Sequence, residues 1–290
     1  MPMICIDENF MKEYMLGEKV IYDNCGKTDS FIKTGVTEID ERCGGLQRGY
    51  TYLITSRPGM GKTAFVFNIW AHLLKDTSHF YRTVIFSPGR CKEQVVNFLA
   101  CIMGAEFATN GNYQKIQEQE KYQEILEKIS MGFSCIDDTP GLSMESIYRS
   151  CKTVEGTIDL IIIDDLQLVD TKECGNTYER LSAVLDDAKK IAMEFNCTVI
   201  MTSQFPGNVE NRINHRPTLD DLVRQDMQIH KVNHIWAIYR DDYYYMDTEM
   251  KGLAEIISLS PMQEVFNFYL AWIPQNCKFA NLTRTIGKND

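Results

Sequence analysis

Short runs of apolar residues recur along the chain, and each is followed by a stretch with helical spacing. The run Leu160–Ile163 has no polar residue on either face, which is typical of a parallel strand buried between two layers of helices. This alternation indicates an α/β fold with a mostly parallel central sheet and helices on both faces. Its strands are expected at 51–55, 82–87, 134–137, 159–164 and 197–203.

The remaining segments divide the chain into one large domain and an N-terminal arm. We expect residues 34–290 to form the α/β domain and residues 1–33 to form the arm, with an amphipathic helix at 8–23. Three late strands follow without predicted helices between them, so we expect them to extend the sheet in antiparallel fashion. These strands are expected at 234–239, 253–258 and 265–273, and the helices at 62–75, 92–104, 113–129, 143–154 and 177–195.

Composition argues against some classes of protein. The 290 residues carry a net charge of −10, which disfavours a protein that coats nucleic acid or membranes by bulk charge but allows a local basic strip. The 10 cysteines form no CxxC pair, so we interpret them as free thiols in a reducing cytoplasm. No apolar run approaches the ~18 residues of a membrane span, and the N-terminus does not resemble a signal peptide.

A glycine-rich segment separates the strand expected at 51–55 from the helix that follows it. It contains Ser56, Arg57, Pro58, Gly59, Met60, Gly61, Lys62 and Thr63. This context is typical of a P-loop, in which backbone N–H groups and a helix N-terminus surround the phosphates of ATP. Lys62 is then expected to contact the β- and γ-phosphates and Thr63 to hold Mg²⁺, although Ser56 replaces the first glycine of the usual pattern.

Polar residues end two further strands. Asp164 follows Leu160–Ile163 and is expected to hold Mg²⁺, because the carboxyl ends of parallel strands meet where ligands bind in open α/β sheets. Gln204 ends the stretch Thr202-Ser203-Gln204, where it can sense the γ-phosphate or position a water molecule. The alternative for both residues is an ordinary polar strand end.

Six segments occur in order along the chain: TGVTEIDERCGGL (34–46), SRPGMGKTAF (56–65), IIIDDLQLV (161–169), TSQ (202–204), IYRDDYYY (238–245) and KGLAEII (251–257). Together they resemble the RecA-like motor domain of the DnaB family of replicative DNA helicases. The resemblance implies a RecA-like P-loop NTPase core, ATP and Mg²⁺ as cofactors, and a hexameric ring that moves along single-stranded DNA in the cytoplasm. It also adds Arg240 to the nucleotide-binding residues, assigns the arm at 8–33 to docking on a neighbouring subunit, and implies a helicase loader or primase as partner.

Three positions depart from the family pattern. Gly89 stands where the family has a catalytic glutamate, Ser260-Pro261-Met262 replaces a Lys-Gln-Arg element that reaches the neighbouring site, and Asp226 replaces a glycine in a DNA-contact loop. A positioned base contributes roughly 10²–10⁴ in rate and an arginine finger roughly 10³–10⁵, so these losses predict weak turnover. Asp165, which follows Asp164, is the expected substitute base, and the alternative is a carboxylate that faces solvent or a basic side chain.

Two functions of different class follow. The first is a DnaB-like helicase with a rearranged hydrolysis site, in which Lys62, Asp164, Asp165 and Gln204 are catalytic. The second is an ATPase-deficient paralogue that binds nucleotide and regulates or joins a helicase ring. A third alternative is a RecA-fold ATPase of the recombinase or clock type. Such proteins share the P-loop core with this chain but lack the segments that match 238–245 and 251–257.

The polar loop at 205–217 is the expected DNA-contacting element. It carries Arg212, His215 and Arg216, and Arg224 follows it. Similar loops in the family line the channel of the ring and contact the phosphate backbone. The alternative is a solvated polar loop without a ligand.

Overall fold

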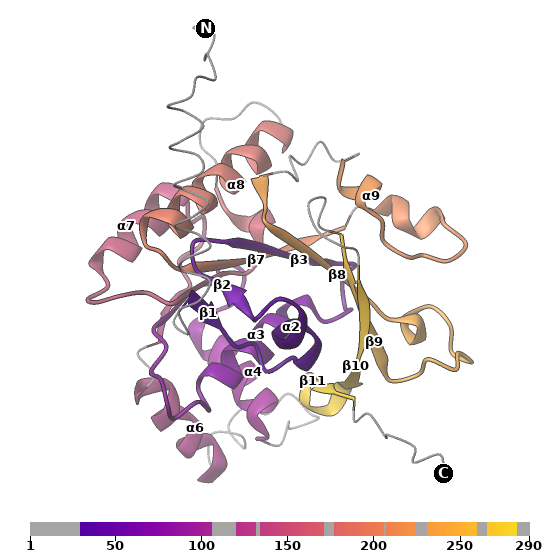
Figure 1. Cartoon of the computed structure of the whole chain (residues 1–290), viewed down its shortest axis with the longest axis horizontal. Helices are drawn as coiled ribbons and strands as arrows, with labels where there is room; N and C mark the ends of the chain where they lie inside the picture. Colours follow the sequence, from indigo (N-terminus) through magenta and orange to yellow (C-terminus); the bar gives the residue numbers. More distant parts are fainter. Residues whose placement is uncertain are drawn as a thin grey trace, which may run out of the picture.

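The computed structural model describes residues 30–105, 120–131, 134–170, 177–205, 207–223, 231–259 and 266–282. The chain folds around a central sheet (Figure 1). Its nine strands follow the order β11-β10-β9-β8-β3-β7-β6-β4-β5. The arm helix predicted at 8–23 lies outside the described residues, as does the first part of the helix predicted at 113–129.

The apolar runs form the parallel part of the sheet. Five of its strands are β3 (Thr51–Ser56), β4 (Thr83–Phe86), β5 (Cys135–Asp137), β6 (Leu160–Ile163) and β7 (Thr198–Gln204). Each of these strands pairs in parallel with its neighbours. The prediction of a mostly parallel central sheet is therefore confirmed.

The late strands differ from the prediction in one respect. β9 (Leu253–Ser258), β10 (Asn267–Ile273) and an unpredicted β11 (Lys278–Asn281) pair in antiparallel fashion, but β8 (His234–Tyr239) runs parallel to β3. β8 also pairs in antiparallel fashion with β9, so the predicted antiparallel extension is confirmed from β8 outward. The parallel pairing of β8 with β3 was not predicted, and it follows from the long crossover that connects β7 to β8. This crossover includes the 3-10 helix η3 (Gly207–Asn211) and the short helix α9 (Leu219–Val223), and it returns the chain to the edge where parallel strands begin.

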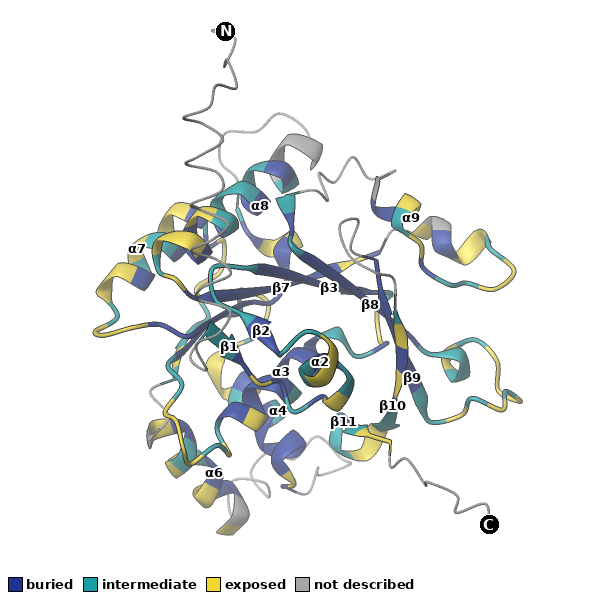
Figure 2. Cartoon of the chain, in the orientation of Figure 1, coloured by how far each residue is buried: buried dark blue, intermediate teal, exposed yellow. Residues whose placement is uncertain are grey.

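Helices cover both faces of the sheet (Figures 1 and 2). One core contains residues of α2 (Thr37–Arg42), α3 (Lys62–Leu73), α4 (Lys92–Met103) and α6 (Glu120–Met131). The other contains residues of α7 (Met144–Thr153) and α8 (Thr177–Glu194). Within β6, Leu160 and Ile162 belong to the first core and Ile161 and Ile163 to the second, which explains why this run has no polar position.

The small two-stranded sheet of β1 (Phe31–Ile32) and β2 (Leu46–Gln47) completes the domain. The cysteines of the described residues are all free, as predicted. In this part of the chain, none of the helices combines the length and the apolar character needed to cross a bilayer.

The parallel register gathers the carboxyl ends of the central strands at one edge of the sheet. Ser56 pairs with Gln204, and Phe86 pairs with Ile163. The residues that follow these strands therefore meet at this edge, where open α/β sheets bind their ligands.

Candidate nucleotide-binding site

The glycine-rich segment forms the turn between β3 and α3. Gly59 and Gly61 have positive φ angles of 79° and 105°, in a region that residues with a side chain rarely adopt. A Cβ atom at Gly61 would also lie 2.9 Å from the ring of Phe279. Ser56, by contrast, is the last residue of β3 and has no positive φ, so a serine fits where the usual pattern has glycine.

Asp164 joins three elements at the end of β6. Its carboxylate is buried, and Oδ1 accepts hydrogen bonds from the hydroxyls of Thr63 at 2.9 Å and Thr202 at 2.6 Å. The other oxygen, Oδ2, accepts a hydrogen bond from Arg90 Nη1 at 2.5 Å. A carboxylate beside a threonine hydroxyl at the start of the helix α3 provides hard oxygen ligands of the kind Mg²⁺ prefers, so these residues fit a metal bound with nucleotide phosphates.

Lys62 and Asp165 face each other at the same edge. The Lys62 Nζ lies 3.5 Å from Asp165 Oδ2, and Gln204 Nε2 donates to the same oxygen at 3.4 Å. Burial raises the pKa of Asp165 above its ordinary value, and the attraction of Lys62 opposes this shift. The structure thus brings together the four residues predicted to be catalytic, which are Lys62, Asp164, Asp165 and Gln204.

The other residues of the turn have distinct surroundings. Pro58 is exposed, whereas the side chain of Met60 is buried in the core and leaves only its backbone for a ligand. Arg57 is bonded to the segment after β7: its Nε donates to Glu210 Oε1 at 2.6 Å, and its Nη1 donates to the carbonyl of Phe205 at 2.8 Å. Arg57 therefore connects the turn to the segment that follows β7.

Arg240 lies beside the turn. Its Nη1 donates to the carbonyl of Gly59 at 3.4 Å, and its guanidinium lies 4.9 Å from the ring centroid of Trp272. Asp242 pairs with this guanidinium at 3.1 Å. The position next to Gly59 places one more cation beside the expected phosphates.

A family model described as the DnaB-like helicase C terminal domain matches residues 31–281. The chain belongs to this family. The match extends from β1 to the end of β11, so it includes nearly all of the described fold, and the resemblance found in the sequence is confirmed.

Relatives of this DnaB-like domain are replicative helicases. The replicative DNA helicase DnaC of Bacillus subtilis (strain 168) is 33% identical over 265 residues, which cover 87% of this chain and 57% of that protein. The replicative DNA helicase DnaB of Geobacillus stearothermophilus is 33% identical over 267 residues, with the same two coverages, 87% and 57%. The chain therefore spans somewhat more than half the length of each relative.

Solved structures agree with this assignment. One of them, described as an ATPase domain, superimposes with a TM-score of 0.78 at 27% identity, covering 96% of this chain and 100% of that one. A DnaB-like replicative helicase, described with its interactions with primase, also gives 0.78 at 26% identity, covering 97% of this chain and 68% of that one. The RadB recombinase gives 0.56 at 13% identity, which supports the RecA-like fold alone.

The described arginines predicted to contact DNA are engaged in ion pairs within the DnaB-like domain. Arg212 pairs with Asp221, which is 0% exposed, and Arg216 pairs with Glu255, which is 4% exposed. The arginine side chains themselves are 30% and 38% exposed. Arg224 lies outside the described residues.

Gly89 lies in a turn after β4. Among the described residues, it is the departure from the DnaB pattern with the largest expected effect on hydrolysis. Arg90 N donates to the carbonyl of Ser87 at 3.1 Å and closes this turn. A Cβ atom at Gly89 would lie 2.6 Å from Cδ1 of Leu168, whose side chain is 49% exposed and free to move aside. A larger residue is therefore compatible with the fold. Sequence reasoning missed Arg90, although its position in the turn that follows β4 at the ligand-binding edge was a usable signal.

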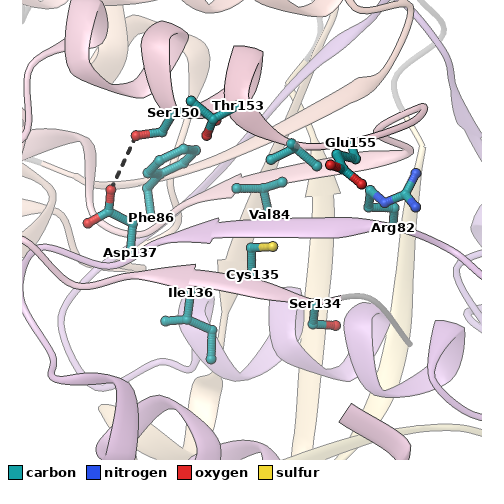
Figure 3. Close-up of a pocket in the computed structure, with 11 residues that line it drawn as sticks. Arg82, Val84, Phe86, Ser134, Cys135, Ile136, Asp137, Ser150, Thr153 and Glu155 are labelled. Atoms are coloured by element: carbon teal, nitrogen blue, oxygen red, sulfur yellow. Dashed lines mark hydrogen bonds between the residues drawn. The ribbon is translucent and has the colours of Figure 1, made fainter. Parts of the chain in front are cut away.

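A separate pocket of about 430 Å³ lies between β4, β5 and α7 (Figure 3). Asp137 and Ser150 face each other in it, and the Ser150 hydroxyl donates to the carboxylate at 3.5 Å. No residue of the glycine-rich turn lines this pocket. The pocket is thus distinct from the candidate nucleotide site.

Proposed function

We propose that this domain is the motor of a replicative DNA helicase, which binds ATP with Mg²⁺ and uses ATP hydrolysis to move along single-stranded DNA in a bacterial or phage-related cytoplasm. The chief support is the buried Asp164 carboxylate, which accepts a hydrogen bond from Thr63 beside Lys62 at the turn between β3 and α3. Relatives named replicative DNA helicases support the same assignment.

Each group at the site has a distinct proposed role. The backbone of 56–63 and the N-terminus of α3 hold the phosphates, and Lys62 contacts the β- and γ-phosphates. Thr63 and Asp164 hold Mg²⁺, which neutralises phosphate charge when bound. Asp165 orients the attacking water molecule, and Gln204 positions the Asp165 carboxylate.

We further propose that hydrolysis is slow. Gly89 provides no carboxylate at the position of the family glutamate, and Asp165 is one methylene shorter than a glutamate. Burial raises the pKa of Asp165, which strengthens it as a proton acceptor. With Asp165 as the base, we expect ATP turnover to be slower than with a glutamate at the usual position.

The second candidate function is a nucleotide-binding paralogue that regulates or joins a helicase ring. Two observations favour it: the glycine at position 89, and the ion pairs that already engage Arg212 and Arg216. In this role the protein binds ATP at the same turn but releases little phosphate.

Steady-state ATPase activity with and without single-stranded DNA, on material sized by light scattering, separates these functions. Hydrolysis that DNA stimulates and that Lys62→Ala abolishes supports the motor. Tight ATP binding without hydrolysis supports the regulatory paralogue. Failure to bind nucleotide contradicts both.

DNA contact has its own test. We propose that Arg212, Arg216 and Arg224 contact the phosphate backbone, so replacing one of them with glutamine reduces the slope of log affinity against log salt by about 0.7. An unchanged slope for all three variants, measured by fluorescence anisotropy, rejects this role.

Assembly is also a proposal. We infer a hexameric ring in which the arm at 1–33 docks on the neighbouring subunit, with a helicase loader or primase as further partner. Deleting residues 1–30 is expected to lower the oligomer size measured by light scattering, and an unchanged mass rejects docking between subunits.

A further inference from the structure

Arg90 is a cation of the site to which the proposal above gives no role. Arg90 Nη1 donates to Asp164 Oδ2 at 2.5 Å, while the other oxygen of the same carboxylate accepts from Thr63 and Thr202. The guanidinium is therefore separated from the Thr63 hydroxyl by a single carboxylate. Asp164 is 1% exposed, whereas the side chain of Arg90 is 41% exposed, so the arginine lies on the open side of the pair.

The backbone that carries Arg90 is held on both sides. Ser87 N donates to the carbonyl of Asp137 in β5 at 2.9 Å, and Arg90 N donates to the carbonyl of Ser87. Helix α4 begins two residues after Arg90, at Lys92, and the backbone N–H of Lys92 donates to Asp138 Oδ2 at 2.9 Å. The side chain can change partner while its Cα position stays fixed.

Charge at the site favours such a change. In the structure Arg90 balances Asp164, and Lys62 lies opposite Asp165. Bound ATP adds negative phosphates at the turn, and Asp164 is then needed by the metal. A guanidinium has five donors in a planar fork that matches phosphate oxygens, so the phosphates become its better partner.

We propose that Arg90 is a catalytic residue that contacts the γ-phosphoryl group during ATP hydrolysis, as an arginine supplied by the same chain. This inference rests on the proposed ATPase function. The water oxygen bonds to the γ-phosphorus, and the bond to the β–γ bridging oxygen breaks with its electron pair passing to ADP. One water proton leaves through Asp165 and the other stays on phosphate. Arg90 stabilises the charge on the transferred group.

The test compares Arg90→Met, which keeps an apolar stem and removes the charge, with Arg90→Lys and with the parent protein. Fluorescent ADP is titrated with Mg²⁺, alone and with aluminium fluoride as a mimic of the transferred phosphoryl group. We expect Arg90→Met to change Mg²⁺–ADP affinity by less than about threefold and to weaken the aluminium fluoride complex by about 10³-fold, the lower end of arginine-finger effects. For Arg90→Lys, we expect the affinity of the aluminium fluoride complex to lie between those of the parent and Arg90→Met.

The matched control is Arg149→Met, which removes an arginine from an ion pair with Glu145 on the surface of α7, where its side chain is 75% exposed. Arg149→Met should leave the affinity for Mg²⁺–ADP unchanged, both with and without aluminium fluoride. Single-turnover hydrolysis should fall with Arg90→Met in parallel with the aluminium fluoride complex.

Equal weakening of both complexes, together with a lower melting temperature, would show that Arg90 only balances the buried charge of Asp164, and it overturns the proposal. Equal behaviour of parent and Arg90→Met overturns it as well, while leaving the ATPase function intact. A parent protein that binds Mg²⁺–ADP but neither forms the aluminium fluoride complex nor hydrolyses ATP in the single-turnover assay contradicts both proposals. Arg90→Lys covers the case in which Arg90→Met fails to fold, because it retains the positive charge beside Asp164.

Discussion

The turn at 56–63 and the segment at 207–223 both follow central strands at the same edge of the sheet, yet they use their charges differently. At the turn, Lys62 lies 3.5 Å from the Asp165 carboxylate, within a group of residues that can take up a ligand. In the second segment, Arg212 is already paired with Asp221, which is 0% exposed. A motif with fixed spacing therefore predicted residues that lie together in a candidate site, whereas a cluster of basic residues did not reveal whether its charges face a ligand or the protein.

The two regions are physically connected. Glu210 Oε1 accepts from Arg57 Nε at 2.6 Å and from the hydroxyl of Tyr244 at 3.2 Å. His215 stacks on the Tyr244 ring at 4.2 Å. Because Glu210 belongs to the predicted DNA-contacting loop and contacts Arg57 of the turn, we expect a change in the turn to affect this loop.

The largest expected effect tests the base at the turn. Asp165→Asn should slow single-turnover ATP hydrolysis by about 10²–10⁴, because it removes the carboxylate that accepts the water proton. Asp247→Asn, in an exposed loop, is the matched control and should leave the rate unchanged. The alternative outcome is an unchanged rate for Asp165→Asn and a large increase in rate for Gly89→Glu. It would show that Asp165 is not the base and that the site can still use a glutamate at position 89. If neither substitution changes the rate, another step limits hydrolysis.

The next effect concerns stability in the second segment. Arg212→Met should lower the free energy of unfolding by about 2 kcal/mol, less than the roughly 3–5 kcal/mol of a fully buried pair because the arginine is partly exposed. It leaves Asp221 buried without its counter-ion. The measurement is urea denaturation, and Arg149→Met, from an exposed ion pair, should cost less than about 0.5 kcal/mol. If both variants lower the free energy of unfolding by the same amount, the ion pair of Arg212 contributes no more to stability than a surface ion pair.

A smaller effect is expected on nucleotide binding. Lys62→Ala should weaken ATP binding by about tenfold or more, equivalent to about 1.4 kcal/mol, because it removes an ammonium directed at the phosphates. Lys92→Ala is the matched control, since Lys92 is likewise the first residue of its helix. Fluorescent-nucleotide titration measures both, and equal affinity of Lys62→Ala and the parent contradicts a working P-loop.

The smallest effect tests the connection between the regions. Arg57→Gln should reduce the stimulation of ATPase activity by single-stranded DNA by about threefold, in keeping with the roughly 0.2–1 kcal/mol of an exposed ion pair. Basal activity without DNA should change less than the stimulated rate. Arg42→Gln, which breaks the surface pair with Glu38, should leave the stimulation as it is. A uniform loss with and without DNA would assign Arg57 to the nucleotide site alone.

The sequence by itself determined the fold class and the centre of the candidate site. Apolar runs reveal strands buried on both faces because every residue of such a strand meets a core, as Leu160 and Ile161 do on opposite sides of β6. The spacing of the turn is equally local, since Gly61 and Lys62 must follow a strand and begin a helix in order to hold phosphates. Parallel strands then carry Asp164 to the same edge.

Only the tertiary structure decided which charges are paired and how the late strands run. Arg90 and Asp164 are far apart in the sequence, as are Arg216 and Glu255, and no local pattern records such pairs. The direction of β8 depends on the path of a long connection, which the spacing of apolar residues does not encode. Local periodicity follows from backbone geometry, whereas ion pairs and strand directions follow from contacts between distant segments that form only in the folded chain.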